Sequence, residues 1–70
     1  MYELQSYLID LKEIMAIHEE SELVGYGTEY KIIFVIKIIF KNGYELKVRY
    51  ECFDEMEDAL ADLKIKVKKI

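Results

Sequence analysis

Two side chains in this 70-residue chain have the chemistry of a nucleophile and a general base, and each occurs once: Cys52 is the only cysteine and His18 the only histidine. Cysteine hydrolases pair a thiolate with an imidazole, and metal sites of nitrogen and sulfur ligands need several such residues. The hydrophobic pattern places Cys52 on a buried strand face and His18 at a helix end. We therefore predict a protein that is not an enzyme and holds no metal or other cofactor.

Carboxylates form the most regular pattern in the sequence. The stretch DEMEDALAD places Asp54, Asp58 and Asp62 four residues apart, which aligns them along one side of a helix with a rise of about 6 Å between neighbours. One interpretation is a solvated polar face whose first acids suit the helix dipole. Evenly spaced carboxylates can also imitate the phosphates of a nucleic acid and occupy a groove built for one.

A second acidic stretch, HEESE, follows the first predicted helix. Glu19, Glu20 and Glu22 would lie near its C-terminus, where negative charge opposes the helix dipole. Residues that break a local rule often have a functional role. An exposed, frayed helix end is the alternative.

The elements that must position these groups follow from the hydrophobic pattern. Apolar residues spaced three and four apart from Leu4 to His18 predict a helix that ends between Glu20 and Gly25. A second helix is predicted from Asp54 to about Leu63, with Glu57 completing a capping box. The run from Glu29 to Phe53 predicts two strands, and the alternating tail KIKVKKI predicts a third.

The turn between the two central strands decides which side chains are buried. A two-residue turn at Asn42–Gly43 would place charged residues opposite Phe40 and its apolar neighbours. A three-residue loop, with Gly43 in the left-handed position of a bulge, pairs Phe40 with Tyr44 and makes one face wholly apolar. Because a slip of one residue inverts every side chain, we predict the bulged loop.

These elements predict a single α+β domain over residues 1–70, with two layers and the order helix–strand–strand–helix–strand. Both helices would cover one face of a three-stranded antiparallel sheet of order 2-1-3, with the first strand central. A chain of this size buries only about 60% of its unfolded surface, so a partner or a dimer would add stability.

On this fold the charges separate into acidic helices and a basic outer sheet face. The lysines could protect strand edges, or the face could bind nucleic acid or an acidic partner. At its centre lie Ile33, Val35 and Ile39, which are aliphatic rather than the aromatic residues that stack on RNA bases and which favour a dimer face. The basic residues of this face are Lys31, Lys37, Lys47, Arg49, Lys64 and Lys66.

Bulk properties limit the classes of partner and compartment. The net charge of −4 argues against general attraction to nucleic acid or anionic lipid. The longest apolar stretch, IIFVIKIIF, contains a lysine and is far shorter than the roughly 20 residues of a membrane-spanning helix. The chain opens without a signal-peptide pattern and a single cysteine cannot form an internal disulfide, so we expect no membrane association and a cytoplasmic location.

In its size, its acidity and its lack of an enzyme motif, the chain resembles the small phage-encoded inhibitors of the anti-CRISPR and anti-restriction type. The stretches HEESE and DEMEDALAD carry the resemblance. It implies a non-enzymatic interaction protein of the host-cell cytoplasm whose acidic side enters the basic nucleic-acid channel of a host nuclease complex. The expected contact residues are Glu19, Glu20, Glu22, Asp54, Glu55, Asp58 and Asp62.

Two alternatives to such an inhibitor remain open. One is a small nucleic-acid-binding module that uses the basic sheet face. The other is a homodimer with a structural or regulatory role, built on Ile33, Val35 and Ile39.

Overall fold

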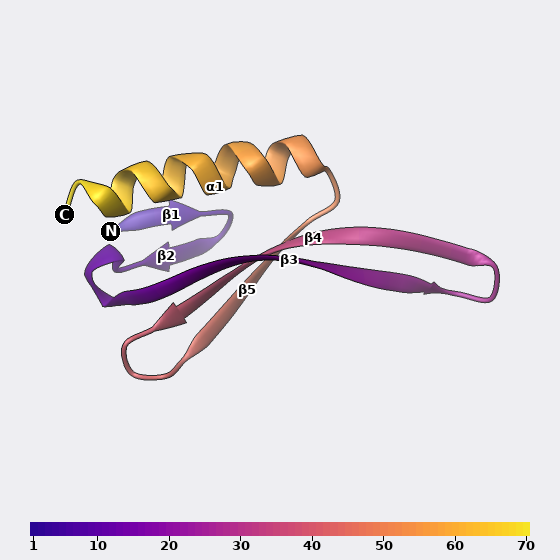
Figure 1. Cartoon of the computed structure of the whole chain (residues 1–70), viewed down its shortest axis with the longest axis horizontal. Coiled ribbons are helices and arrows are strands. Elements are labelled where there is room, and N and C mark those ends of the chain that lie inside the picture. The colour runs from indigo at the N-terminus through magenta and orange to yellow at the C-terminus, as the bar shows by residue number, and fades with distance from the viewer.

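The computed structural model, which describes residues 1–70, consists of a short hairpin, a long three-stranded sheet and one helix (Figure 1). The hairpin is formed by β1 (Tyr2–Leu4) and β2 (Tyr7–Ile9), and a 3-10 turn, η1 (Leu11–Glu13), follows it. The antiparallel sheet has the order β3–β4–β5, with strands β3 (Ile14–Tyr26), β4 (Glu29–Phe40) and β5 (Glu45–Tyr50). The chain ends in helix α1 (Phe53–Lys68).

The prediction of a helix over residues 4–18 is wrong, because this segment forms the hairpin, η1 and the first part of β3. Gln5 adopts a φ of 54° in the hairpin turn, and the Asp10 carboxylate accepts a hydrogen bond from the Lys12 N–H, which caps η1. Pairing with β4 then holds the following residues in an extended conformation. Tertiary pairing of this kind overrides an apparent helical spacing.

The predicted third strand at the C-terminus is also wrong, because α1 continues to Lys68. Leu63 and Val67 lie four residues apart and extend the inward face of Met56 and Leu60, whereas Ile65 is 52% exposed. Lysine is a good helix former, and its charge suits the C-terminal end of the helix dipole. The helix begins at Phe53 with Cys52 as its N-cap, and Cys52 makes no side-chain capping bond. The predicted capping box, with Asp54 as the cap, is therefore wrong.

The two-helix, 2-1-3 architecture is therefore replaced by one helix and two sheets. The first of the predicted strands, β4, is central, but its second neighbour is β3 rather than the C-terminal tail. The register across the β4–β5 loop is confirmed. Phe40 and Tyr44 pair through a bond of 2.8 Å from the Phe40 N–H to the Tyr44 carbonyl, and Gly43 has a φ of 88°.

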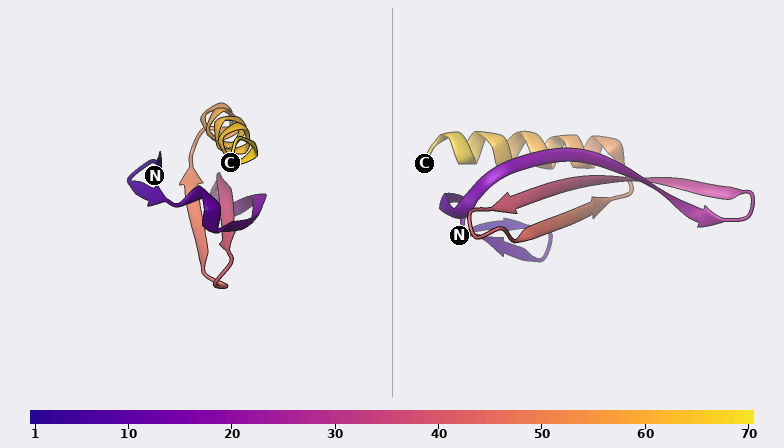
Figure 2. Two further views of the ribbon diagram at one scale, coloured as in Figure 1. Left: turned by 90° about the vertical axis from the view of Figure 1, so that its left-hand side faces the viewer. Right: turned by 60° about the horizontal axis from the view of Figure 1, so that its bottom comes forward.

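The core lies between α1 and the face of the sheet that carries the even-numbered residues of β4. The end-on view in Figure 2 shows the helix above the sheet, with the β1–β2 hairpin on the β5 side and β3 on the other. Phe34 and Phe53 meet edge to face, with ring centroids 5.3 Å apart, where the helix begins. The buried core residues are Leu4, Ile9, Ile36, Ile38, Val48, Met56, Leu60 and Leu63.

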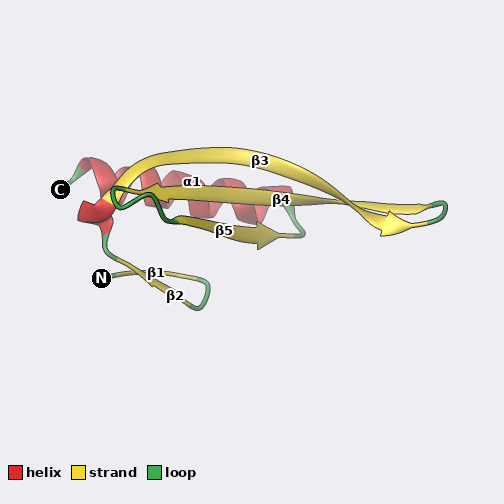
Figure 3. Cartoon of the chain, turned by 90° about the horizontal axis from the view of Figure 1, so that it is seen from below, coloured by secondary structure: helices red, strands yellow, loops and turns green.

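The sheet is much longer than the layer that the helix covers. The distal parts of β3 and β4 continue as a two-stranded ribbon, so that the molecule is 45 Å long but only 18 Å thick (Figure 3). We call residues 23–32 the arm. Its Gly27–Thr28 turn has Gly27 at a φ of 62°, as the first position of a type II′ hairpin turn requires.

Candidate interaction surfaces

The outer sheet face, opposite the helix, is balanced in charge rather than basic. The Lys37 ammonium lies 3.6 Å from the Glu20 carboxylate and 3.4 Å from that of Glu45. Arg49 binds Glu22 at 3.0 Å, and Lys31 binds Glu51 at 2.5 Å. Glu20 and Glu22 lie on β3, where they form ion pairs with Lys37 of β4 and Arg49 of β5. They are not at a helix C-terminus, so they do not oppose a helix dipole.

This pairing divides the predicted basic surface. Lys31, Lys37 and Arg49 are neutralised by neighbours, whereas Lys47 on the same face takes part in no ion pair. Lys64 and Lys66 lie on α1, in the other layer of the molecule. The six bases that were predicted to act together therefore do not form one surface.

The predicted dimer face has little accessible apolar area at its centre. Val35 is fully buried, between its cross-strand neighbours Glu20 and Arg49. Ile33 and Ile39 are partly buried beside it. Their aliphatic side chains thus form a small second core beneath the ion pairs.

The seven predicted acidic contacts fall on three surfaces. Glu20 and Glu22 lie on the outer sheet face, and Glu19 lies on the helix side of β3, opposite Ile36. The other four lie on α1, where none forms an ion pair. These four are Asp54, Glu55, Asp58 and Asp62.

Asp62 has a structural partner, because it accepts a hydrogen bond of 2.5 Å from the Tyr2 hydroxyl. Burial and this carboxylate raise the pKa of Tyr2 from 10.0 to about 12. Burial also raises the pKa of Tyr50, against the opposing effect of a hydrogen bond with Gln5. The hydrogen bond between Tyr2 and Asp62 holds β1 against the helix. A raised pKa keeps the Tyr2 hydroxyl protonated, so it is a structural donor and not an activated phenol.

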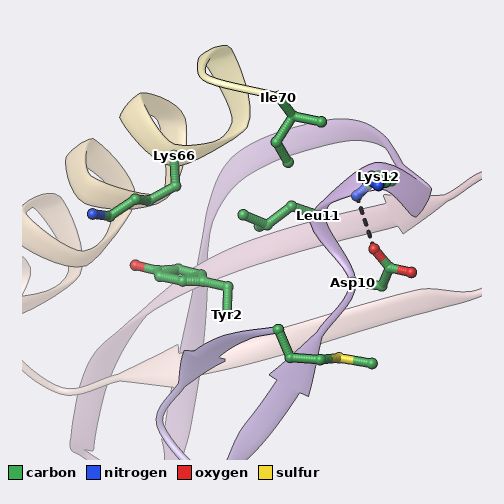
Figure 4. A pocket seen from close by; sticks show the side chains of 7 residues that line it. Tyr2, Asp10, Leu11, Lys12, Lys66 and Ile70 are labelled. Carbon is green, nitrogen blue, oxygen red and sulfur yellow. Dashed lines mark hydrogen bonds between the residues drawn. The ribbon is translucent and has the colours of Figure 1, made fainter.

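A shallow cavity of about 570 Å³ lies between the C-terminal end of α1 and the η1 turn (Figure 4). Tyr2, Leu11, Lys66 and Ile70 line it together with Met1, Asp10 and Lys12. Its one carboxylate, Asp10, already accepts the Lys12 N–H at 3.1 Å. The walls thus offer apolar surface and lysine cations, without a paired acid and base that could transfer a proton.

The two residues considered for catalysis lie far apart in the fold. His18 is exposed on β3, at one edge of the sheet, and Cys52 is exposed between β5 and α1, at the other edge. No hydrogen bond joins them. No group of three or more histidine, cysteine or carboxylate side chains comes together where it could hold a metal ion.

The arm is the surface that the sequence-based predictions missed. On its helix-side face Leu23, Tyr30 and Ile32 are 66%, 64% and 54% exposed, and on its outer face Val24 and Tyr26 are 44% and 94% exposed. The signal that could have identified it is the Gly27–Thr28 pair between two stretches rich in β-branched and aromatic residues.

The two edges of the sheet differ in how they are covered. The β5 edge is capped by the hairpin, whose Gln5 side chain donates a hydrogen bond of 2.8 Å to the Arg49 carbonyl. The other edge is β3, 13 residues long. Between Ile17 and Gly25, the backbone N–H and C=O groups on the side of β3 away from β4 take part in no side-chain hydrogen bond and in no turn or loop backbone bond.

No protein-family model, curated protein or solved structure matches the chain. No helix in it has both the length and the apolar character needed to span a bilayer.

Proposed function

We propose that this chain is a non-enzymatic interaction protein that binds another protein through its arm. The observation that carries the proposal is the position of five large apolar side chains, exposed over ten residues beyond the part of the sheet that the helix covers. A concentration of exposed apolar side chains on a small protein is typical of interaction sites.

The composition of the arm suits a protein partner. Tyrosine is enriched in protein interfaces and among the residues that contribute most to binding, and Tyr26 and Tyr30 are both largely exposed here. Removing apolar surface from water contributes about 25 cal/mol per Å². The arm can therefore supply binding free energy that the ion-paired outer face cannot.

Site-specific photocrosslinking in the native host tests this proposal. A photoreactive amino acid at Tyr30 is compared with the same residue at Tyr44, which has a closely similar exposure of 66% but lies in the β4–β5 loop, outside the arm. We expect a discrete protein adduct from position 30 that survives nuclease treatment, and none from position 44. Equal adducts at both positions, or none at position 30, would contradict a role of the arm.

A second candidate function is the inhibitor activity that the phage-type resemblance implies. It is supported by the first ten residues of α1, which carry five acids and no base and form no ion pair. A basic nucleic-acid channel would complement this charge. In this case the helix carboxylates Asp54, Glu55 and Asp58 are the main contacts, because Asp62 is engaged with Tyr2.

Charge reversal on the helix tests the second candidate. We expect the double variant Asp54→Lys, Asp58→Lys to lose the protein adduct formed by a photoreactive residue at Ala61, which is exposed on α1. The control Glu3→Lys, Glu13→Lys changes the net charge equally at two exposed sites on the hairpin and η1 and should retain it. Loss in both variants would indicate a general effect of net charge, and loss in neither would exclude the helix as the contact.

A further inference from the structure

We infer that the partner of the arm is a second copy of this chain, joined by antiparallel pairing of the two β3 edges about Leu23. This inference rests on the proposed role of the arm and names its partner. The product would be a continuous six-stranded sheet with a two-fold axis through the pair of Leu23 residues.

Strand β3 has a row of backbone groups ready to pair. The even-numbered residues of β4 bond to β5, as the Phe40–Tyr44 pair shows, so its odd-numbered residues bond to β3. Their partners in β3 are even-numbered from Ala16 to Tyr26. The N–H and C=O groups of the odd-numbered residues therefore point away from the sheet, and those are Ile17, Glu19, Ser21, Leu23 and Gly25.

This edge lacks most of the features that normally prevent edge-to-edge pairing. Proteins protect such edges with charged side chains, especially lysine, or with proline, bulges or a covering element. The charged side chains of this edge are Glu19, Glu20 and Glu22. Between Ile14 and Tyr26 there is no lysine, arginine or proline, and the one irregularity in the β3–β4 ladder lies between Ile14 and Ala16, away from the arm. Figure 2 shows the hairpin on the opposite side of the sheet, so it does not cover this edge.

The glutamates of β3 exclude every register centred on a residue from Glu19 to Glu22. Because only odd-numbered residues present outward groups, odd positions must pair with odd positions. Pairing centred on Ser21 would oppose Glu20 to Glu22 of the second copy, and pairing centred on Glu22 would oppose the two Glu22 residues. Like charges directly opposite each other destabilise a sheet.

Pairing centred on Leu23 avoids these contacts, and it keeps more of the two strands paired than a register centred on Val24 or Gly25. It places Glu22 opposite Val24 and Glu20 opposite Tyr26 of the second copy, and it places Ser21 opposite Gly25. The two Leu23 side chains then meet on the helix side of the sheet, next to Ile32, which is the cross-strand neighbour of Leu23 within each copy. The exposed apolar side chains of both arms are thereby brought together.

The size of the chain is compatible with such an interface. A standard interface buries about 800 Å² on each partner, which is roughly a sixth of the 5135 Å² that this chain exposes. The paired edges contain Glu20 and Glu22, which keep their ion pairs with Lys37 and Arg49 of the same copy.

Cysteine scanning tests both the pairing and its register, in a Cys52→Ser background that removes the exposed native thiol. Directly opposed residues in a hydrogen-bonded antiparallel pair lie about 5.5 Å apart between Cα atoms, within the range of a disulfide. We expect Leu23→Cys to form a disulfide-linked dimer under mild oxidation. We expect Ser21→Cys to form no disulfide-linked dimer, because the two Ser21 residues would be offset by about 13 Å along the strands.

Analytical ultracentrifugation of two variants at Ser21 provides an independent test. Ser21→Pro removes an outward N–H without removing a bond of the β3–β4 ladder, and Ser21→Ala keeps that N–H. We expect a monomer–dimer equilibrium for Ser21→Ala and for the unaltered chain, and a monomer for Ser21→Pro, with the same far-ultraviolet circular dichroism for all three.

Several results would overturn the inference. They are a monomeric unaltered chain at every concentration, a dimer that Ser21→Pro leaves intact, or a disulfide that forms at position 21 and not at 23. A monomer whose position 30 still crosslinks to a different protein would overturn the self-pairing alone and leave the proposed role of the arm in place.

Discussion

The C-terminal half of α1 offers a sharp test of the fold, because two neighbouring apolar residues have opposite environments. Leu63 is fully buried against the sheet, whereas Ile65 is 52% exposed. If residues 64–68 formed a strand, Ile65 and Val67 would both face the core. Alanine at position 63 and alanine at position 65 therefore distinguish a helix from a strand.

The expected magnitudes differ enough to be measured easily. Truncating a buried leucine to alanine costs about 2–5 kcal/mol, through lost transfer free energy and the cavity left behind. Most surface substitutions change stability by less than about 0.5 kcal/mol. Alanine also has a higher helix propensity than isoleucine, which offsets part of the contact that Ile65→Ala removes.

Urea denaturation of the purified variants, followed by circular dichroism, measures both effects. A chain of this length has a total stability of about 4–10 kcal/mol, so Leu63→Ala should lose a large part of it and Ile65→Ala should unfold near the midpoint of the unaltered chain. Equal losses in the two variants, or a larger loss for Ile65→Ala, would refute the helical placement of this segment.

Two further predictions concern the arm and the hairpin. A Cβ atom at Gly25 would overlap the Glu29 carbonyl oxygen, at a φ of +153°. Gly25→Ala should therefore remove hydrogen-exchange protection from the arm but not from the core. The control Thr28→Ala, in the same arm at a residue whose φ is not positive, should preserve the protection of both. Tyr2→Phe should cost about 1 kcal/mol at neutral pH, since it removes the bond to Asp62. Because the folded pKa of Tyr2, about 12, exceeds its unfolded value of 10.0, this stabilisation is complete below pH 10 and is lost as the pH rises through 12. Denaturation midpoints across that range should therefore fall less steeply for Tyr2→Phe, with the remaining slope due partly to Tyr50, whose pKa is also raised.

The part of the fold that could be predicted is the part that burial alone decides. The register of β4 and β5 was predicted because a slip of one residue would bury charges beside Ile36 and Ile38. The N-terminal third could not be predicted in the same way, because its apolar residues fit a helical spacing, although only Leu4 and Ile9 among them are buried. Pairing with β4 decided the conformation of residues 14–18, and the sequence signal for that pairing, the Gly27–Thr28 turn, lies well outside this segment.

The same long-range pairing explains why the candidate sites changed. The glutamates of HEESE were expected beside the acids of α1, and β3 instead carries two of them to the bases of β4 and β5. The tail lysines were expected on the sheet, and the helix instead carries them away from Lys37 and Arg49. Residue types could be read from the sequence, but which charges neutralise one another depended on the topology.

The resulting distribution of charge makes the two proposed contacts, the arm and the helix carboxylates, respond differently to salt. The acids of α1 lie within its first ten residues and Lys64, Lys66 and Lys68 within its last five, so the charge varies along the helix rather than between two layers. The arm between Leu23 and Ile32 is largely apolar. Exposed charges separated by more than about 8 Å are screened at physiological salt, whereas the hydrophobic contribution is not weakened by it. A complex formed through the arm should therefore persist as sodium chloride is raised, and one formed through the helix carboxylates should dissociate.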